Sequence, residues 1–337
     1  MQTSRDQRLD QKSSKKSPEY PFVSIIVLNW NGKRFVDGFF DTIAKQTYPQ
    51  DKIEILFVDN GSTDDSVDYF ESKHIANARL IETGKNYGYS GGNNYGFREA
   101  VGEYIVVCNN DLELAPDWLE KLVAAAQQTQ ADIVVPKLVY AESKTINNAG
   151  STLLPNSDWP NVERGMNQPV DDPEFNNQVE VTAFCGASPL FTRSFLHDVG
   201  LFDKHFFLYW EDGDLSWRGQ KLNKRYVYAP ESVAYHHTSG SSGGEQSPVF
   251  IYYVSRNRLL VLIKHASLKV VLKAFAKVGR DHVLYKIRDV WKATIHGSGR
   301  KPAAKALWLG IKILCGALWL TPIMLAKRWK LLREETI

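Results

Sequence analysis

The residues that could form a cation or phosphate site stand where apolar segments end. The apolar run 104–108 passes directly into Asn109-Asn110-Asp111, and Asp59 follows a second apolar run in the same way. A carboxylate at the carboxyl end of a buried strand can hold a divalent cation against a nucleotide diphosphate. A plain strand-to-helix turn uses the same residue types, and Pro116 has the place of a first helical residue. On this segment alone both interpretations stay open.

Two further groups of reactive side chains follow later in the chain. They are the acidic cluster Glu211-Asp212-Gly213-Asp214 and the pair His236-His237, and each stands at the end of a predicted element. Because groups of reactive side chains recur at the ends of predicted elements, one shared site is favoured over a set of unrelated turns.

Composition limits the class of protein. A chain of 337 residues can bury a large core, and we expect one large domain with an appendage. A formal charge of +3 gives no support to a nucleic-acid binder. Three dispersed cysteines predict neither a disulfide framework nor a cysteine zinc site, which favours a reducing compartment, the cytoplasm.

The amino-terminal segment is polar and carries no apolar signal-peptide core. Residues 1–21 cannot bury enough apolar surface to offset the entropy of ordering, so we expect a disordered tail.

From residue 22 to about residue 136, short β-branched runs alternate with segments of helical spacing. The expected strands are Val23 to Leu28, Ile53 to Val58, Ala78 to Ile81, Tyr104 to Cys108 and Ile133 to Val135. Helical faces are expected around Phe35–Ile43 and Trp118–Val123. This alternation predicts an α/β fold with a mostly parallel sheet covered on both faces, and ligands at the carboxyl ends of its strands.

A glycine-rich stretch, residues 84–94, is expected to be a loop that enters a helix. Glycines there allow the backbone to approach a phosphate-bearing ligand closely. The stretch matches neither the dinucleotide fingerprint nor the P-loop, and a plain flexible loop has the same composition.

The order and spacing of these segments resemble one known family. Residues 23–32, Val58–Asp64, Asn109–Asp111 and Glu211–Leu215 together resemble family 2 glycosyltransferases, and within them the rhamnosyltransferase-type bacterial enzymes. The resemblance covers Phe22 to His265. It implies a GT-A fold for residues 22–265, with residues 266–337 as a helical appendage.

The resemblance implies a donor site for a nucleotide-diphosphate sugar. Asp59 would accept the ring N–H of a uracil or thymine base, although a helix N-cap at Ser62 or Thr63 explains this turn as well. The other expected donor-binding residues are Asn29, Asn60, Asn86, Gly88, Asn94, Asn110 and Arg256.

Asp111 is the expected principal metal ligand. Members of the family often carry Asp-x-Asp where this chain has Asn109-Asn110-Asp111, so an amide replaces one carboxylate. The expected cofactor is Mg²⁺ or Mn²⁺. The resemblance also places a histidine near the metal, and of the pair we slightly prefer His237 to His236; a structural histidine is the alternative.

Transfer with inversion requires a base that removes the proton of the acceptor hydroxyl. The family motif points to Asp212 as this base, with Glu211 beside it after the aromatic run 206–210. Asp214 would orient the base or pair with Arg218. A solvated acidic helix start is the alternative.

Three regions are assigned more coarsely. Thr238 to Gly244 is expected to form a lid, and residues 137–200, with 184–188 lining the cleft, to recognise the acceptor. Arg256 and Arg258 would meet phosphate, or else pair with acidic neighbours.

The segment Ala306 to Ala326 is apolar and rich in tryptophan, with Lys312 and Pro322 inside it. Lys312 and Pro322 argue against a bilayer span. The tryptophans and the flanking cations favour a helix lying in or dipping into the inner leaflet, and a helix packed on another subunit fits equally.

We therefore expect an inverting, metal-dependent glycosyltransferase that moves a sugar, rhamnose among the options, to a saccharide acceptor on a lipid carrier. It would work in the cytoplasm on the inner face of the membrane, with a homo-oligomer as an option. The competing class is a non-catalytic nucleotide-sugar or glycan-binding scaffold, against which the joint presence of Asp59, Asp111 and Asp212 argues. The motifs leave the sugar, the acceptor and the linkage open.

Overall fold

The structure is a computed structural model that describes residues 20–237, 244, 246–295 and 300–334. Most of the expected lid, Thr238 to Gly244, and residues 1–19 of the expected tail lie outside these residues. Tyr20 and Pro21, which we also assigned to the tail, instead contact the domain. Tyr20 stacks edge-on against Tyr48, whose hydroxyl donates to the Pro21 carbonyl.

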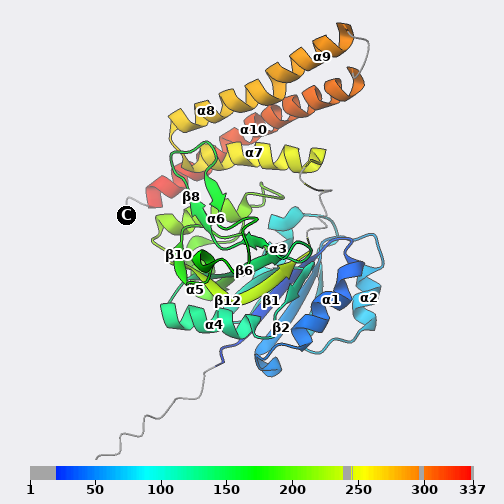
Figure 1. Ribbon diagram of the computed structural model, residues 1–337, viewed down its shortest axis with the longest axis vertical. Helices are drawn as coiled ribbons and strands as arrows, with labels where there is room; N and C mark the ends of the chain where they lie inside the picture. The colour runs from blue at the N-terminus through cyan, green and yellow to red at the C-terminus, as the bar shows by residue number, and fades with distance from the viewer. Residues whose placement is uncertain (1–19, 238–243, 245, 296–299, 335–337) are drawn as a thin grey trace, which may run out of the picture.

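One large sheet organises the domain (Figure 1). Its strands pair in the order β10-β12-β6-β11-β4-β1-β2-β3. The strands are β1 (Val23–Asn29), β2 (Ile53–Asp59), β3 (Ala78–Glu82), β4 (Tyr104–Asn109), β5 (Leu112–Leu114), β6 (Ile133–Tyr140), β7 (Ile146–Asn148), β8 (Ser151–Leu153), β9 (Asn161–Glu163), β10 (Val179–Val181), β11 (Leu190–Thr192) and β12 (Tyr226–His236). Of these, β5 pairs with β12, β7 pairs with β6, and β8 and β9 form a separate hairpin.

The helices of the sheet domain are α1 (Lys33–Ala44), α2 (Ser66–Ser72), α3 (Gly88–Glu99), α4 (Trp118–Thr129), α5 (Arg193–Val199) and α6 (Glu211–Lys221), with 3₁₀ turns η1 (Gln50–Lys52) and η2 (Pro173–Phe175). The carboxyl-terminal helices are α7 (Pro248–His265), α8 (Leu268–Gly279), α9 (Tyr285–Ile295) and α10 (Arg300–Glu334), with the π-helical turn η3 (Arg280–Leu284) joining α8 to α9.

The sequence-based strands are confirmed, each extended by one or more residues at its carboxyl end. Strands β3, β2, β1 and β4 run parallel in the expected way, and β6 is parallel to β12. Between these two groups the short strand β11 runs antiparallel to both β4 and β6. The α/β fold is thus confirmed, and its sheet is mixed at the centre.

Alternate residues of the buried strands feed two cores, as the period of two requires. Ile25 and its neighbours on one face pack against α1, α2 and α4, while Ile26 and its neighbours on the other face pack against α3, α5 and α6. Helix α4 begins at Trp118, two residues after Pro116, which we expected to be the first helical residue. The Pro116 carbonyl accepts the Thr47 N–H.

Helices α7, α8 and α10 share a third core with Phe206, Trp210 and Trp217 of the sheet domain. Helices α8 and α9 form one long arm that extends away from the sheet, and α10 runs back along it (Figure 1). Helix α7 ends at His265, where we placed the end of the glycosyltransferase domain. The division into domains stays a prediction.

Candidate active site

Asn29 joins the ends of three parallel strands. Its amide nitrogen donates to Asp59 Oδ1 at 3.2 Å and to Ser62 Oγ at 3.2 Å, and its Oδ1 accepts from the amide of Asn110 at 2.9 Å. Because β1, β2 and β4 are parallel neighbours, their carboxyl ends meet at one edge. The structure therefore brings three of the expected donor-binding residues into one hydrogen-bonded group.

Asp59 is almost fully buried and shapes its own turn. Its Oδ2 accepts the backbone N–H groups of Gly61 and Ser62 at 3.1 and 3.0 Å. Gly61 has a φ of +73°, and a β-carbon there would lie 2.5 Å from Lys85 Cα. Helix α2 begins later, with Asp65 as its N-cap, so the expected alternative of a helix cap at Ser62 or Thr63 is wrong. Base binding by Asp59 stays a prediction.

The glycine-rich stretch is a loop that enters α3, as expected, and Asn60 fixes it. The Asn60 amide donates to Asn86 Oδ1 at 3.1 Å and to the Gly88 carbonyl at 3.0 Å, and its Oδ1 accepts the Tyr87 N–H at 3.0 Å. Gly88 has a φ of +72°, and a β-carbon there would overlap the Phe207 carbonyl. Asn60, Asn86 and Gly88 thus bring the loop against the aromatic run 206–210.

Asp111 meets a histidine, but not the one that we preferred. Its Oδ1 lies 3.3 Å from His236 Nε2, because β5 pairs with β12 and places Leu112 opposite His236. His237 instead contacts Glu113 at 2.9 Å and Glu142 at 3.4 Å. We therefore transfer the metal-ligand prediction from His237 to His236.

The donor set at this point suits a divalent cation. His236 Nδ1 lies 3.1 Å from Asn147 Oδ1, so the proton of that nitrogen can be donated to Asn147. The lone pair of Nε2 then faces the Asp111 carboxylate, and two electron-pair donors this close need a positive charge or a proton between them. In residues 20–237, 244, 246–295 and 300–334, no group of three His, Cys, Asp or Glu side chains has the arrangement of a metal site. A cation here would take its remaining oxygen ligands from a diphosphate and water.

Glu211 and Asp212 form the first turn of α6, and both lie in a sheltered position. Glu211 is 5% exposed, and its Oε2 has no hydrogen-bond partner. Asp212 is partly exposed, with Oδ2 accepting the Gly186 N–H at 3.1 Å and Oδ1 accepting the Gly213 N–H at 2.7 Å. The expected alternative of a solvated helix start is therefore wrong.

Burial raises the pKa of both carboxyl groups, that of Glu211 the more strongly. Burial and the neighbouring Asp212 raise the pKa of Glu211 well above the ordinary value. Burial also raises the pKa of Asp212, while the N–H groups of Gly213 and Gly186 oppose the rise. A carboxylate of raised basicity that is open to solvent on one side has the properties of a general base.

The aromatic run before α6 is backbone-strained. Phe207, Tyr209 and Trp210 have φ values of 66°, 65° and 72°, which non-glycine residues rarely adopt. The Asn257 amide on α7 holds this run by donating to the carbonyls of Phe206, Leu208 and Tyr209, each at 2.8 Å. Strain of this kind persists only where surrounding contacts compensate for it. The strained run sets the position of α6 and therefore of the carboxyl groups of Glu211 and Asp212.

Asp214 takes the second of its two expected roles and pairs with Arg218. It also contacts Lys264 and His265, and Lys264 in turn contacts Asp203 at 3.1 Å. Burial alone would raise the pKa of Asp214, but Lys264, Arg218 and His265 hold it well below the ordinary range. Asp214 is thus part of a buried ion cluster behind α6.

Two of the expected donor-binding residues are engaged elsewhere. Asn94 exchanges two hydrogen bonds with the backbone of Phe202, and Arg256 donates to the carbonyls of His205 and Phe206. Both side chains are buried, and these contacts secure the loop that precedes α6. Donor binding by Asn94 and Arg256 stays a prediction without support from the geometry.

The comparison with family models decides the classification. The model of glycosyl transferase family 2 matches residues 24–199, more than half of the chain. The chain belongs to glycosyl transferase family 2. The match covers Asp59 and Asp111 but ends before α6, so the roles of Glu211 and Asp212 rest on geometry and on the motif.

This family 2 glycosyltransferase is similar to curated proteins of the same class. It is 24% identical over 251 residues to the low-salt glycan biosynthesis hexosyltransferase Agl10 of Haloferax volcanii, covering 71% of this chain and 74% of that one. It is 26% identical over 247 residues to the N-acetylglucosaminyl-diphospho-decaprenol L-rhamnosyltransferase of Mycobacterium tuberculosis, covering 65% of this chain and 77% of that one. The resemblance to rhamnosyltransferases is thereby confirmed.

A solved structure supports the fold of the glycosyltransferase. The mannosyltransferase of Pyrobaculum calidifontis, determined with GDP-mannose and Mn²⁺, aligns with a TM-score of 0.52 at 17% identity over 90% of this chain and 87% of its own. At that identity the likeness shows the GT-A fold.

Tyr89, Gly186 and Asn147 complete the site of the glycosyltransferase and were missed from the sequence. The Tyr89 hydroxyl donates to the Gly186 carbonyl at 2.5 Å, and the Gly186 N–H donates to Asp212. One residue, Gly186, therefore links α3, which follows the donor loop, to the candidate base. The motif 184–188 was the signal that could have found Gly186, whereas Tyr89 and Asn147 carried none.

Proposed function

We propose that this protein transfers a sugar from a nucleotide-diphosphate donor to a saccharide acceptor, with inversion at the anomeric carbon and with Asp212 as the base. The observation that carries the proposal is the sheltered Glu211–Asp212 pair, tied through Gly186 to Tyr89 of α3. A binding scaffold has no use for a carboxylate of raised pKa at this position.

The donor would lie along the edge where β1, β2 and β4 end. Asp59 Oδ1 accepts one hydrogen bond in the structure and keeps a second lone pair for the ring N–H of the base. Asn29 and Asn110 fix the orientation of this edge, and Asn60 fixes the glycine-rich loop that would cover the donor. The rhamnosyltransferase likeness supports rhamnose as the transferred sugar. A donor built on deoxythymidine or uridine diphosphate would present the ring N–H that Asp59 can accept.

Asp111 and His236 would hold Mg²⁺ or Mn²⁺. A cation bound there supplies positive charge to the diphosphate as the leaving group departs. The Mn²⁺ in the Pyrobaculum calidifontis mannosyltransferase structure supports a divalent cation of this kind.

Asp212 would then act on the acceptor. Its carboxylate takes the proton from the acceptor hydroxyl while that oxygen bonds to the anomeric carbon and the bond from carbon to the diphosphate oxygen breaks. Attack from the face opposite the leaving group inverts the anomeric centre. Glu211 keeps its proton, so it adds no second negative charge beside Asp212.

The acceptor is proposed to be a saccharide on a lipid diphosphate at the inner face of the cell membrane. The name of the Mycobacterium tuberculosis relative describes such an acceptor. In the part of the chain that the structure describes, α10 is the helix with the length and apolar composition to cross a membrane, and only 22% of its most apolar window is buried. These two observations support a peripheral, cytoplasmic enzyme.

Calorimetric titration with a panel of nucleotide sugars, with and without Mn²⁺, tests the donor site. We expect one donor class to bind, and His236→Gln to weaken its Mn²⁺-dependent affinity about tenfold or more. His237→Gln is the matched control and should change the affinity less than threefold, because His237 faces Glu113 and Glu142. Absence of binding by every donor would favour the scaffold, and a stronger effect of His237→Gln would return the ligand to that position.

A further inference from the structure

We infer that α8, α9 and α10 form a docking surface for an anionic lipid bilayer, and that α10 lies in the membrane interface instead of crossing the membrane. This inference rests on the proposed function for the place of the acceptor. The surface itself is argued from the exposed side chains of these helices, their charge and the way α10 is packed.

One face of α10 presents three tryptophans to solvent. Trp308, Trp319 and Trp329 are 58%, 83% and 57% exposed. They lie eleven and ten residues apart, close to three turns each, so they share a face. Leu318 and Leu325, 59% and 50% exposed, flank the same stripe. Exposed apolar area on this scale marks an interaction surface, and tryptophan is the residue that membrane interfaces favour.

The arm formed by α8 and α9 adds a second exposed apolar stripe. Leu284, Ile287, Trp291 and Ile295 follow helical spacing, and each is 49% to 65% exposed. Leu268 and Leu272 extend the exposed apolar surface near the base of the arm. An amphipathic pair of helices of this kind suits an interfacial position.

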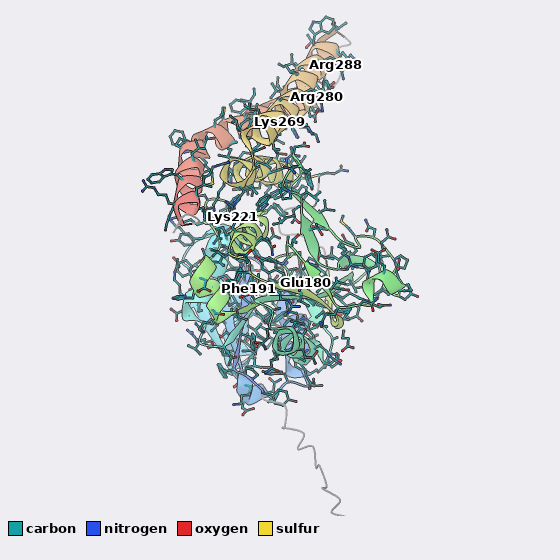
Figure 2. All side chains as sticks on the ribbon, turned by 90° about the vertical axis from the view of Figure 1, so that its left-hand side faces the viewer. Glu180, Phe191, Lys221, Lys269, Arg280 and Arg288 are labelled. Carbon is teal, nitrogen blue, oxygen red and sulfur yellow. The ribbon has the colours of Figure 1, made fainter. Side chains whose placement is uncertain are left out.

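Charge identifies the partner. Residues 268–333 contain fifteen Lys and Arg residues against two Asp residues. Lys269, Arg280 and Arg288 lie along the length of the arm (Figure 2). A surface that combines tryptophan, leucine and excess cations fits an anionic lipid headgroup layer with acyl chains beneath it.

Packing argues against a spanning α10. Ile313, Ala317 and Met324 are fully buried, and Gly316 lies so close to α7 that a β-carbon there would be 2.7 Å from the Tyr252 hydroxyl. Further along, Lys327 contacts Asp203 at 2.5 Å, and Arg328 donates to the carbonyls of Ile263 and Ala266.

The part of α10 before these contacts is residues 300–312, about 20 Å of helix. That is less than the hydrocarbon thickness of about 30 Å. The same part packs against η3 and α9, so a spanning α10 would also draw the cations of the arm into the hydrocarbon. An interfacial position keeps every one of these contacts.

Flotation of the full chain on a density gradient with lipid vesicles tests this inference. We expect the protein to float with vesicles that contain phosphatidylglycerol, to stay behind with pure phosphatidylcholine, and to be released by high salt. Trp319→Glu should lower the partition coefficient about tenfold or more, because this side chain makes few contacts within the protein. Leu222→Glu, at an exposed leucine after α6, is the matched control and should bind as the wild type does.

The charge contribution is tested separately. Lys269→Glu combined with Lys305→Glu should weaken binding about fivefold or more for each substitution. Lys45→Glu combined with Lys52→Glu, at exposed positions of the sheet domain, should leave it unchanged.

Three results would overturn the inference. Equal binding to neutral and anionic vesicles would show that lipid charge plays no part. Resistance of the cellular protein to alkaline carbonate extraction would show that α10 spans the membrane. A dimer that forms without lipid, and that Trp319→Glu dissociates without reducing vesicle binding, would show that the exposed face of α10 binds a second copy of the chain. Donor binding measured without vesicles is independent of all three, so it reports on the proposed function alone.

Discussion

Glu211 and Asp212 are adjacent carboxyl groups in very different surroundings. Asp212 receives two backbone N–H groups, whereas Glu211 Oε2 is buried without a partner. The two N–H groups offset part of the cost of burying the Asp212 anion, whereas burial and the neighbouring Asp212 raise the pKa of Glu211 well above the ordinary value and favour its protonated form. Neutral Glu211 is what allows Asp212 to be ionised beside it.

Glu211→Gln tests the proton on Glu211. The folded pKa of Glu211 is raised above 4.5, so keeping this proton costs stability that grows as the pH rises above that value. Gln has no proton to lose, so the variant should unfold at a higher temperature than the wild type at neutral pH. The difference should vanish as the pH falls through about 4.5. Thermal unfolding between about pH 4 and pH 8 measures it.

Glu71→Gln, at an exposed carboxylate of α2, is the control and should show no such pH dependence. A Glu211→Gln variant that is less stable than the wild type at neutral pH would mean that Glu211 is ionised in the folded chain.

Residue identity predicted which side chains meet at the strand ends, but not which histidine lies beside Asp111. Asp59, Asn29 and Asn110 do converge, because polar residues at the ends of parallel strands must meet at one edge. The choice between His236 and His237 depends on the pairing of β5 with β12, which places Leu112 opposite His236. A three-residue strand leaves no periodic signal, so the sequence could not reveal that pairing.

At the scale of elements, α6 and α7 hold the candidate base between them. Asn257 of α7 fixes the strained run before α6, and Lys264 of α7 contacts Asp214 of α6 and Asp203 of the preceding loop. Lys327 of α10 also contacts Asp203. The position of Asp212 thus depends on contacts made by helices outside the family-model match.

Lys264→Met and Lys327→Met should differ strongly in their effect on stability. Lys264 is buried and contacts the carboxylates of both Asp203 and Asp214, so its loss removes positive charge from two buried anions at once and should cost about 3–5 kcal/mol. Lys327 is one-third exposed, and Asp203 keeps Lys264, so its loss should cost about 1 kcal/mol. Urea unfolding of the two variants measures both values, and equal losses would contradict the cluster as described.

The elements between residues 137 and 200 were the hardest to predict. Strands β7, β8, β10 and β11 have three residues each, too few for an alternating pattern. β11 nevertheless sits between β4 and β6 and makes the sheet mixed. Only tertiary pairing determines such a strand.

At the scale of the whole molecule, the carboxyl-terminal helices have two roles. They pack on the sheet domain, and they expose apolar side chains to solvent. The sequence predicted an apolar, tryptophan-rich helix and left open whether it contacts membrane or protein. The structure packs one face of α10 on α7 and exposes the other, so contact with protein does not exclude contact with membrane. Periodicity could not show this division, since apolar residues surround most of the helix.

Truncation before Ala306, the simplest test of membrane attachment, is therefore expected to do more than detach the protein. It would remove Ile313, Ala317, Met324 and Lys327 from their contacts with the rest of the chain. We expect the shortened chain to unfold at a lower temperature than the full chain even without lipid, with a loss of several kcal/mol, about 2 to 5 for each large buried side chain. An unchanged melting temperature would mean that α10 is attached loosely.

The measurement to make first compares Asp212→Asn with the wild type for donor affinity by calorimetry and for release of nucleoside diphosphate in the presence of a lipid extract. Asn keeps the shape of the side chain but cannot take a proton. We predict a loss of turnover of about 10²- to 10⁴-fold, with donor affinity changed by less than a few-fold. Turnover within a few-fold of the wild type would show that Asp212 is not the base and would contradict the mechanism proposed for this glycosyltransferase.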